Sequence, residues 1–219
     1  MRPIKAALVG ASHPHSSAYL RTLQFSYLVA SIVVCEEDSV ALEKLLRNGT
    51  EKIGGTFNSL SSLLQSGDIT FAIATLPTDL NPLLCERLLE AGVHVFSEKP
   101  VAKTAAQIEK LISIARRKNR KLGVAYVTRL HPAVQKARRM IRKGVIGRVT
   151  SVEARFITSQ VRYRDPKHWL FSHQRAGGGI LSWLGCHYVD LMRFVLADEV
   201  LSVSMLANTF CDEPIDVED

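Results

Sequence analysis

The residues of this sequence best suited to chemistry lie in the tripeptide Glu98-Lys99-Pro100. The tripeptide closes an apolar run, Gly92–Ser97, that has the pattern of a buried strand. An open parallel sheet binds ligands beyond the carboxyl ends of its strands. A lysine that is desolvated, or that lies beside another cation, can exchange protons near neutrality. The pattern therefore indicates either a proton-handling lysine at a ligand-binding edge or a solvent-facing lysine at a strand end.

The elements that must position this lysine alternate between strand-like and helix-like segments over the first 125 residues. The apolar, β-rich segments that predict strands are 4–9, 30–35, 69–75, 93–96 and 122–127. The segments with helical periodicity are 16–25, 40–47, 60–65, 81–91 and 104–118. Repeated strand–helix alternation with short loops is typical of α/β proteins, and it predicts a doubly wound parallel sheet of the Rossmann type.

The pattern changes near Val124–Leu130, where we place a domain boundary. We expect a helix at 132–143, a half-exposed strand at 148–158 and an irregular loop at 159–176. Gly177-Gly178-Gly179 then opens an apolar helix, 180–196, which a last strand, 200–207, and a weakly structured acidic tail follow. The expected domains are therefore residues 1–125 and residues 126–219, the second an incomplete α+β open-sheet domain.

The composition is that of an ordinary globular protein, with 47% hydrophobic and 22% charged residues. The net charge of +7 comes largely from basic runs in helical patterns without interleaved aromatic residues. Such runs indicate a solvated face rather than nucleic-acid binding. The four cysteines form no C-x-x-C pair, and no signal peptide or membrane span is visible, so we expect a cytoplasmic protein with reduced thiols.

The first predicted strand ends in Gly10-Ala11-Ser12-His13-Pro14-His15, where a dinucleotide-binding turn would read G-x-G-x-x-G. Gly10 can supply the tight turn, and Ser12 is small enough for close approach of a pyrophosphate. His15 adds bulk where the third glycine normally stands. His13 and His15 could contact a phosphate, pack or face solvent. By itself the turn fits a cofactor site and a structural loop equally well.

Glu36 favours the cofactor site. It ends the second predicted strand, where a carboxylate can accept hydrogen bonds from a ribose 2′-hydroxyl. Such a carboxylate repels a 2′-phosphate, so the residues favour NAD over NADP. The alternative is a solvated turn acid beside Glu37 and Asp38.

Longer segments resemble two family signatures. Ala91–Pro100 is similar to "AGKHVLCEKP", and Gly177–Asp190 is similar to "GGGALLDLGVHYID". Arg129–Pro132 and Gly144–Val149 match "RFHP" and "G-x-I-G-x-V" between them. All four resemble the glucose–fructose oxidoreductase, inositol dehydrogenase and rhizopine-catabolism (Gfo/Idh/MocA) family, in order and at family spacing over essentially the whole chain.

The resemblance implies a dinucleotide-binding Rossmann domain at 1–125 and a partial substrate and oligomerisation domain at 126–219. It also implies hydride transfer between a nicotinamide cofactor and a sugar- or polyol-like hydroxyl or ketone. Lys99 matches the family lysine and His187 the histidine that handles the proton. Trp183 stands in place of the family aspartate and predicts an apolar wall. Asp190 either orients His187 instead or matches the family's second aspartate.

Other positions carry weaker predictions from the resemblance. Cofactor contacts are expected at Pro77, Asn81 and Glu98, and substrate-pocket contacts at Arg129 and Trp169, the latter with loop packing as its alternative. The remaining histidines lack metal-ligand spacing among themselves, so we expect no metal.

Two departures from the family leave other functions open. The aspartate is replaced by Trp183, and family members continue well beyond Ala207, so the chain resembles a C-terminally truncated member. A non-catalytic dinucleotide-binding sensor or subunit, or an inactive member, is therefore the alternative to an enzyme. The expected partners are a small polyol- or sugar-like substrate and, through the unpaired edges of the C-terminal sheet, a second copy of the chain, with no nucleic acid and no membrane.

Overall fold

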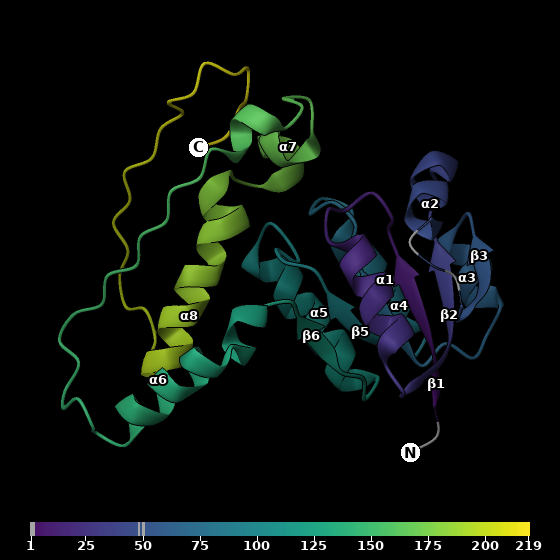
Figure 1. The fold of residues 1–219 in the computed structure, drawn as a ribbon, viewed down its shortest axis with the longest axis horizontal. Coiled ribbons are helices and arrows are strands. Elements are labelled where there is room, and N and C mark those ends of the chain that lie inside the picture. The colour runs from purple at the N-terminus through teal and green to yellow at the C-terminus, as the bar shows by residue number, and fades with distance from the viewer. Residues whose placement is uncertain (1–2, 48, 50) are drawn as a thin grey trace. The chain divides into compact units, whose positions relative to one another are not determined.

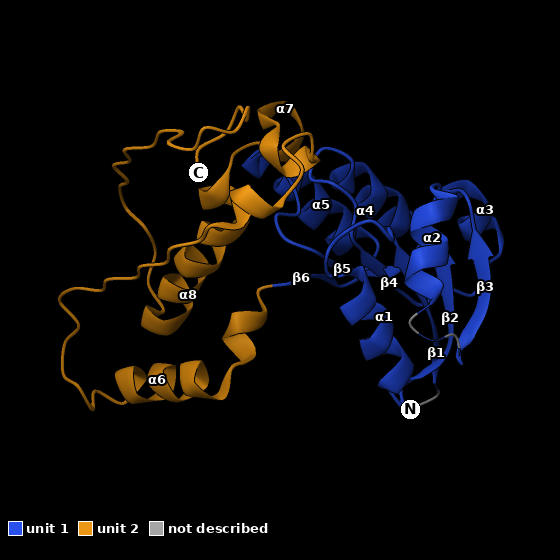
Figure 2. Ribbon diagram, turned by 45° about the horizontal axis from the view of Figure 1, so that its top comes forward, with its two compact units in different colours: residues 1–125 blue, residues 126–219 orange. Residues whose placement is uncertain are grey.

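The computed structural model describes residues 3–47, 49 and 51–219. The chain divides into two compact units, Met1–Ala125 and Tyr126–Asp219 (Figure 2). Each unit is built on different elements, and each is described separately below.

The first unit contains a six-stranded sheet in the order β3-β2-β1-β4-β5-β6, in which every pair of neighbours is parallel (Figure 1). Its strands are β1 Ile4–Val9, β2 Val29–Cys35, β3 Ile53–Phe57, β4 Phe71–Ala74, β5 His94–Ser97 and β6 Leu122–Val124. The predicted doubly wound α/β fold is confirmed. Strand β3 was not predicted, because Gly54 and Gly55 lower the β propensity of its sequence.

Helices connect these strands: α1 Ser16–Phe25, α2 Ser39–Leu46, α3 Leu60–Gln65, α4 Asn81–Glu90 and α5 Ala105–Arg117. Alternate strand residues enter two separate cores. Ala7 and Val33 pack with the apolar side chains of α3, α4 and α5, whereas Leu8 and Val34 pack with those of α1 and α2. The central strands are apolar on both faces because helices cover both.

The strand order reverses between β1 and β4, because β2 and β3 lie on one side of β1 and β4 to β6 on the other. At such a switch point the loops after neighbouring strands lead to opposite faces and leave a crevice at the carboxyl edge. The turn after β1 and Thr75, which follows β4, both lie at this edge.

The regular elements of the second unit are all helices or helical turns, and the long segments that connect them lack regular structure (Figure 1). Its elements are η1 Val127–Leu130, α6 Pro132–Arg142, η2 Gln160–Tyr163, η3 Trp169–Phe171, α7 His173–Ala176, the π turn η4 Leu181–Gly185 and α8 Cys186–Leu196. The predicted strands at 148–158 and 200–207 are not present within residues 126–219, all of which the structure describes. Neither segment has the ladder of hydrogen bonds from a neighbour that a strand needs.

None of the helices in the described part of the chain is long and apolar enough to cross a lipid bilayer.

Candidate functional site

The turn after β1 is built around Gly10. Its φ of +102° is a conformation that L side chains rarely adopt, and an added Cβ would lie 2.7 Å from Thr75 Oγ1. The Gly10 carbonyl accepts hydrogen bonds from the hydroxyls of Thr75 (2.7 Å) and Ser16 (2.9 Å), both completely buried. The backbone after β1 thus turns against Thr75 and α1 with no room for a side chain, so this position requires glycine.

We expect Gly10→Ala to lower the free energy of unfolding by at least about 2 kcal/mol, because strain at positive φ adds to the overlap with Thr75. Urea denaturation measures this loss. Gly67→Ala is the matched control, since Gly67 has a φ of +66° and no neighbouring atom within 4 Å of an added Cβ. Strain alone costs about 1 kcal/mol there. Equal losses in the two variants would show that the turn has room for a side chain.

Glu36 follows β2 and holds the same turn. Its carboxylate accepts the backbone N–H of Ala11 (2.5 Å) and that of Asp38 (3.0 Å). A carboxylate has about four lone-pair sites, so these two bonds leave acceptor capacity for a hydroxyl donor. Glu36 is therefore both a brace for the turn and an acceptor at the carboxyl edge of β2.

Glu98 is the centre of a buried hydrogen-bond network. Its Oε1 lies 2.6 Å from His15 Nδ1 and accepts the Tyr19 hydroxyl at 2.7 Å, while Oε2 accepts the backbone N–H of Lys99 at 2.6 Å. Burial acts to raise the pKa of the carboxyl, but the hydrogen bonds from His15 and Tyr19, with the nearby His13 and the Lys99 N–H, lower it to about 2. Burial and the adjacent Glu98 charge raise the pKa of Tyr19. Glu98 is therefore an ionised acceptor, and its partners donate.

The low pKa of Glu98 predicts that the free energy of unfolding falls in acid. The ionised Glu98 stabilises the fold above the carboxyl pKa of the unfolded chain, and that stabilisation is lost as pH falls from about 5 towards 2. For a carboxylate whose side chain is 5% exposed, the loss is on the order of 2 to 3 kcal/mol. We expect Glu98→Gln to remove this part of the pH dependence of the unfolding free energy.

The measurement is urea unfolding at pH 7, 4 and 3 for the wild type, Glu98→Gln and the control Glu109→Gln, which changes an exposed carboxylate on α5. A Glu98→Gln protein that loses as much stability on acidification as Glu109→Gln would contradict the assignment.

Lys99 follows β5 and is 4% exposed. Asn81, at the start of α4, is completely buried, and its Nδ2 donates to Ser97 Oγ (2.7 Å) and to the Val101 carbonyl (3.2 Å). These two partners lie on either side of Glu98-Lys99-Pro100, so Asn81 braces the loop that carries the lysine. The Pro77 carbonyl in turn accepts the Asn81 N–H at 2.9 Å.

His13 and His15 lie in the turn with different exposures: His13 is buried, and the His15 side chain is 51% exposed. With Glu98 they place ligand atoms within 4.8 Å of one another, a spacing that could hold a metal ion. However, His13 Nδ1 accepts the His15 N–H at 3.1 Å, and both Glu98 oxygens accept protein donors. A metal would have to displace these bonds. The sequence prediction missed the cluster because Glu98 is 83 residues from His15. Ser12, between Gly10 and the histidines, is exposed.

In the second unit the Gly177–Asp190 signature contains a π turn, which follows its three glycines. Trp183 lies in η4 and His187 in the first turn of α8. The Arg164 guanidinium lies 4.7 Å from the Trp183 ring centre, and the His187 ring makes an edge contact with Tyr126 at 6.0 Å. Single π turns inside helices are frequent at functional sites.

Asp190 is buried and paired with Arg129. Arg129 Nε donates to Asp190 Oδ2 at 2.7 Å, and Nη2 donates to Oδ1, which makes the pair bidentate. The hydrogen bonds that Arg129 donates to the Asp190 carboxylate raise the pKa of Arg129. Arg129 also lies over the Tyr126 and Phe194 rings. The two predicted substrate-pocket residues are therefore joined to each other, and Asp190 is engaged by Arg129.

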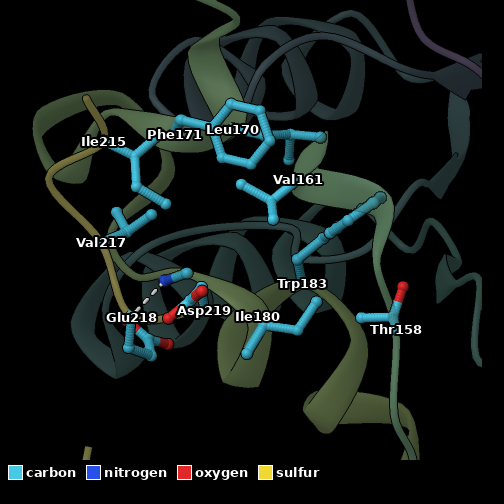
Figure 3. Close-up of a pocket in the computed structure, with 11 residues that line it drawn as sticks. Thr158, Val161, Leu170, Phe171, Ile180, Trp183, Ile215, Val217, Glu218 and Asp219 are labelled. Atoms are coloured by element: carbon cyan, nitrogen blue, oxygen red, sulfur yellow. Dashed lines mark hydrogen bonds between the residues drawn. The ribbon is translucent and has the colours of Figure 1, made fainter. Parts of the chain in front are cut away.

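A mostly apolar pocket with about 410 Å³ of empty space lies beside Trp183 (Figure 3). Val161, Leu170, Ile215 and Val217 line it with Trp183, and Glu218 lies at its border. Trp169 is half-buried next to Leu170, with its ring 5.5 Å from that of His168.

The acidic tail, which the sequence predicted to be weakly structured, is anchored to the glycine run. The Glu218 carboxylate accepts the N–H of Gly179 (2.7 Å) and of Leu181 (3.2 Å), and its carbonyl accepts the N–H of Ile180 (3.0 Å). A Cβ on Gly179 would overlap the Glu218 carbonyl. One tail residue therefore caps the helical segment that carries Trp183 and His187.

Comparison with known proteins identifies the family of this chain. Residues 4–126 match the model "Oxidoreductase family, NAD-binding Rossmann fold", and residues 134–219 match the "GFO/IDH/MocA C-terminal domain". Levoglucosan dehydrogenase from Pseudarthrobacter phenanthrenivorans is 26% identical over 97% of this chain and 56% of its own length. Inositol 2-dehydrogenase from Rhizobium meliloti is 29% identical over 80% of this chain and 52% of its own length. The chain thus spans about half the length of these curated relatives.

Solved structures give the same picture. The WlbA dehydrogenase of Chromobacterium violaceum, solved with NADH and UDP-GlcNAcA, is 26% identical with a TM-score of 0.84, over 100% of this chain and 62% of that one. Levoglucosan dehydrogenase in complex with NADH and levoglucosan has a TM-score of 0.79 at 24% identity, over the same shares, which shows a common fold.

Proposed function

Because the chain belongs to the GFO/IDH/MocA oxidoreductase family, we propose that it is an NAD(H)-dependent oxidoreductase of a sugar- or polyol-like hydroxyl or ketone. The observation that carries the proposal is the carboxyl edge of the sheet, where the Gly10 turn, Glu36 and Lys99 follow β1, β2 and β5. Relatives of this chain are dehydrogenases of levoglucosan and of inositol.

The residues at this edge fit a dinucleotide. The turn at Gly10 carries no side chain, because an added Cβ would overlap Thr75, and Ser12 is exposed beside it. Glu36 has acceptor capacity for a ribose hydroxyl and would repel a 2′-phosphate, so we propose NAD rather than NADP. Pro77 and Glu98 lie in the loops after β4 and β5, and Asn81 begins α4. We propose that these three residues border the nicotinamide half of the site.

The cofactor, when bound, supplies the acceptor or donor for a hydride. We propose that His187 accepts the proton of the substrate hydroxyl in the oxidation direction and returns it in reduction. For Lys99 we propose a hydrogen bond to the substrate that stabilises negative charge developing in the transition state. Trp183 excludes water on one side of the substrate. We place Arg129, Asp190 and Trp169 in the substrate domain, with the Arg129–Asp190 pair as a positioning element.

The first test is fluorescence titration of the full chain with NADH and NADPH, followed by absorbance assays of NAD⁺ reduction with a panel of polyols and anhydrosugars. Saturable NADH binding and turnover of one panel member support the proposal. Absence of NADH binding would refute it.

One observation favours a second function, a dinucleotide-binding sensor or subunit without catalysis. Trp183 occupies the position of the family aspartate, and its ring faces Arg164 rather than an acid. A sensor predicts NADH binding with no turnover on any panel member. Turnover that disappears with His187→Asn would exclude it.

We also propose that two copies of the chain associate through the segments 148–158 and 200–207, because these expose apolar side chains. Ile157, Leu201 and Leu206 are each more than nine-tenths exposed. Such surfaces commonly mark interfaces. Light scattering after size exclusion tests this, with a dimer or larger assembly expected for the wild type and a monomer for Leu201→Glu/Leu206→Glu. A monomeric wild type would contradict it. A cytoplasmic location is a further proposal, and it is supported by the four free cysteines.

A further inference from the structure

The β1–α1 turn differs from a glycine-rich dinucleotide turn in how it uses its backbone donors. A glycine turn aims the N–H groups at the start of its helix at the pyrophosphate. Here His13 takes two of them: its carbonyl accepts the Ser16 N–H at 3.0 Å, and its Nδ1 accepts the His15 N–H at 3.1 Å. The backbone at the start of α1 therefore offers fewer donors to an anion than the family turn would.

The side chain of His15 can replace them. His15 is the residue immediately before α1, and its side chain is 51% exposed. Glu98 is ionised and can only accept, so the Nδ1 of His15 is the donor in their 2.6 Å hydrogen bond. Nε2, on the far side of the ring, is consequently turned away from the carboxylate. It is the ring atom left for a ligand.

The support behind His15 is rigid. The Tyr19 hydroxyl donates to the same Glu98 oxygen, and the Lys99 N–H donates to the other, which fixes both oxygens of the carboxylate. The His13 ring packs edge-on against His15 with centroids 5.1 Å apart. An imidazole oriented by a carboxylate has a fixed tautomer and ring direction, as in metal and catalytic sites. An Nε2–H held in this direction can donate a hydrogen bond to a phosphate oxygen, and the negative charge of the phosphate makes that bond charge-assisted.

We propose that His15, oriented by Glu98, binds the diphosphate of a dinucleotide in place of the backbone amides of a glycine-rich turn. This rests on the proposed NAD(H) function, and it assigns Glu98 and Tyr19 as positioning residues for His15. It also explains why the bulk of an imidazole stands where the family has its third glycine.

The decisive variant is His15→Gly, which restores that glycine. If the only requirement at this position is that the cofactor can approach the backbone closely, His15→Gly binds NADH as well as the wild type or better. If His15 binds the diphosphate, we expect His15→Gly and His15→Ala each to lower the affinity for NADH and for ADP about tenfold. This is the effect of losing one charge-assisted hydrogen bond. The affinity for adenosine should change by less than about twofold in either variant, because adenosine has no phosphate to contact His15.

Arg21→Ala is the matched control, because Arg21 is an exposed cation further along the same helix. Affinities are measured on the full chain by NADH fluorescence and by displacement with ADP or adenosine. Each titration is run without and with EDTA, and thermal melts check that the variants fold. Failure of the wild type to bind NADH refutes the proposed function and this inference together. NADH binding that His15→Gly leaves unchanged, or a loss equal to that of Arg21→Ala, overturns this inference alone. An effect of His15 that disappears when EDTA is added would assign it to a metal ion and overturn it too.

Discussion

Replacing Lys99 by methionine is expected to lower kcat by about 10² to 10⁴-fold, the range for loss of a group that stabilises charge or moves a proton in the transition state. The substitution keeps the length and apolar stem of the side chain and removes only the ammonium group. Lys99 is 4% exposed, and its loop is braced by Asn81 and Glu98, so the backbone that carries the lysine is held in place before a substrate arrives. Such preorganisation makes its contribution large.

The measurement separates catalysis from folding and binding. Turnover, NADH affinity and the melting temperature are recorded for Lys99→Met and for Lys103→Met, which changes an exposed lysine four residues later. We expect Lys103→Met to match the wild type in all three. A Lys99→Met protein that retains turnover within about threefold of the wild type would remove Lys99 from the mechanism.

Replacing His187 by asparagine is also expected to lower kcat by about 10² to 10⁴-fold, with a smaller change in KM. Asparagine keeps a polar side chain of similar size but cannot take the hydroxyl proton. The Glu218 cap of the preceding π turn, which the substitution does not touch, holds the helix that carries His187. The fold of the second unit should therefore survive the substitution.

His131→Asn is the control for this variant. His131 is exposed at the N-cap of α6, where its side chain accepts the Ala133 N–H, and asparagine is a good N-cap residue. We expect His131→Asn to leave turnover unchanged. Lys99→Met/His187→Asn should lose little more than the worse single variant if both residues act on one step. A simple product of two small losses would indicate that neither residue is catalytic.

The fold of the first unit was largely predictable because its signals are local. Apolar runs ending at glycine or proline located β1, β4 and β5, and helical periodicity located α1, whose bounds match the prediction. Strand β3 escaped because its stability comes from pairing with β2 rather than from its own composition. The segments 148–158 and 200–207 were predicted to be strands from their composition, but they have no neighbouring strand to pair with and form none.

The site was predictable where a motif fixed it and not where side chains distant in sequence meet. Gly10, Glu36 and Lys99 could each be identified from the strand that precedes it. The contacts that define their environment join residues far apart in the chain, such as Glu98 with His15 and Tyr19, Asn81 with Val101, and Glu218 with Gly179. No spacing rule encodes these pairs, since they depend on which loops the sheet order brings together.

The most direct test of the proposed activity is transfer of label. The full chain is incubated with NAD⁺ and polyols or anhydrosugars deuterated at their carbinol carbons, and the NADH formed is examined by mass spectrometry and NMR. We expect deuterium at C4 of the nicotinamide with one class of substrate, and labelling at least about 100-fold slower with Lys99→Met or His187→Asn. NADH binding without any label transfer across the panel, or transfer that both variants retain, would contradict the proposed oxidoreductase.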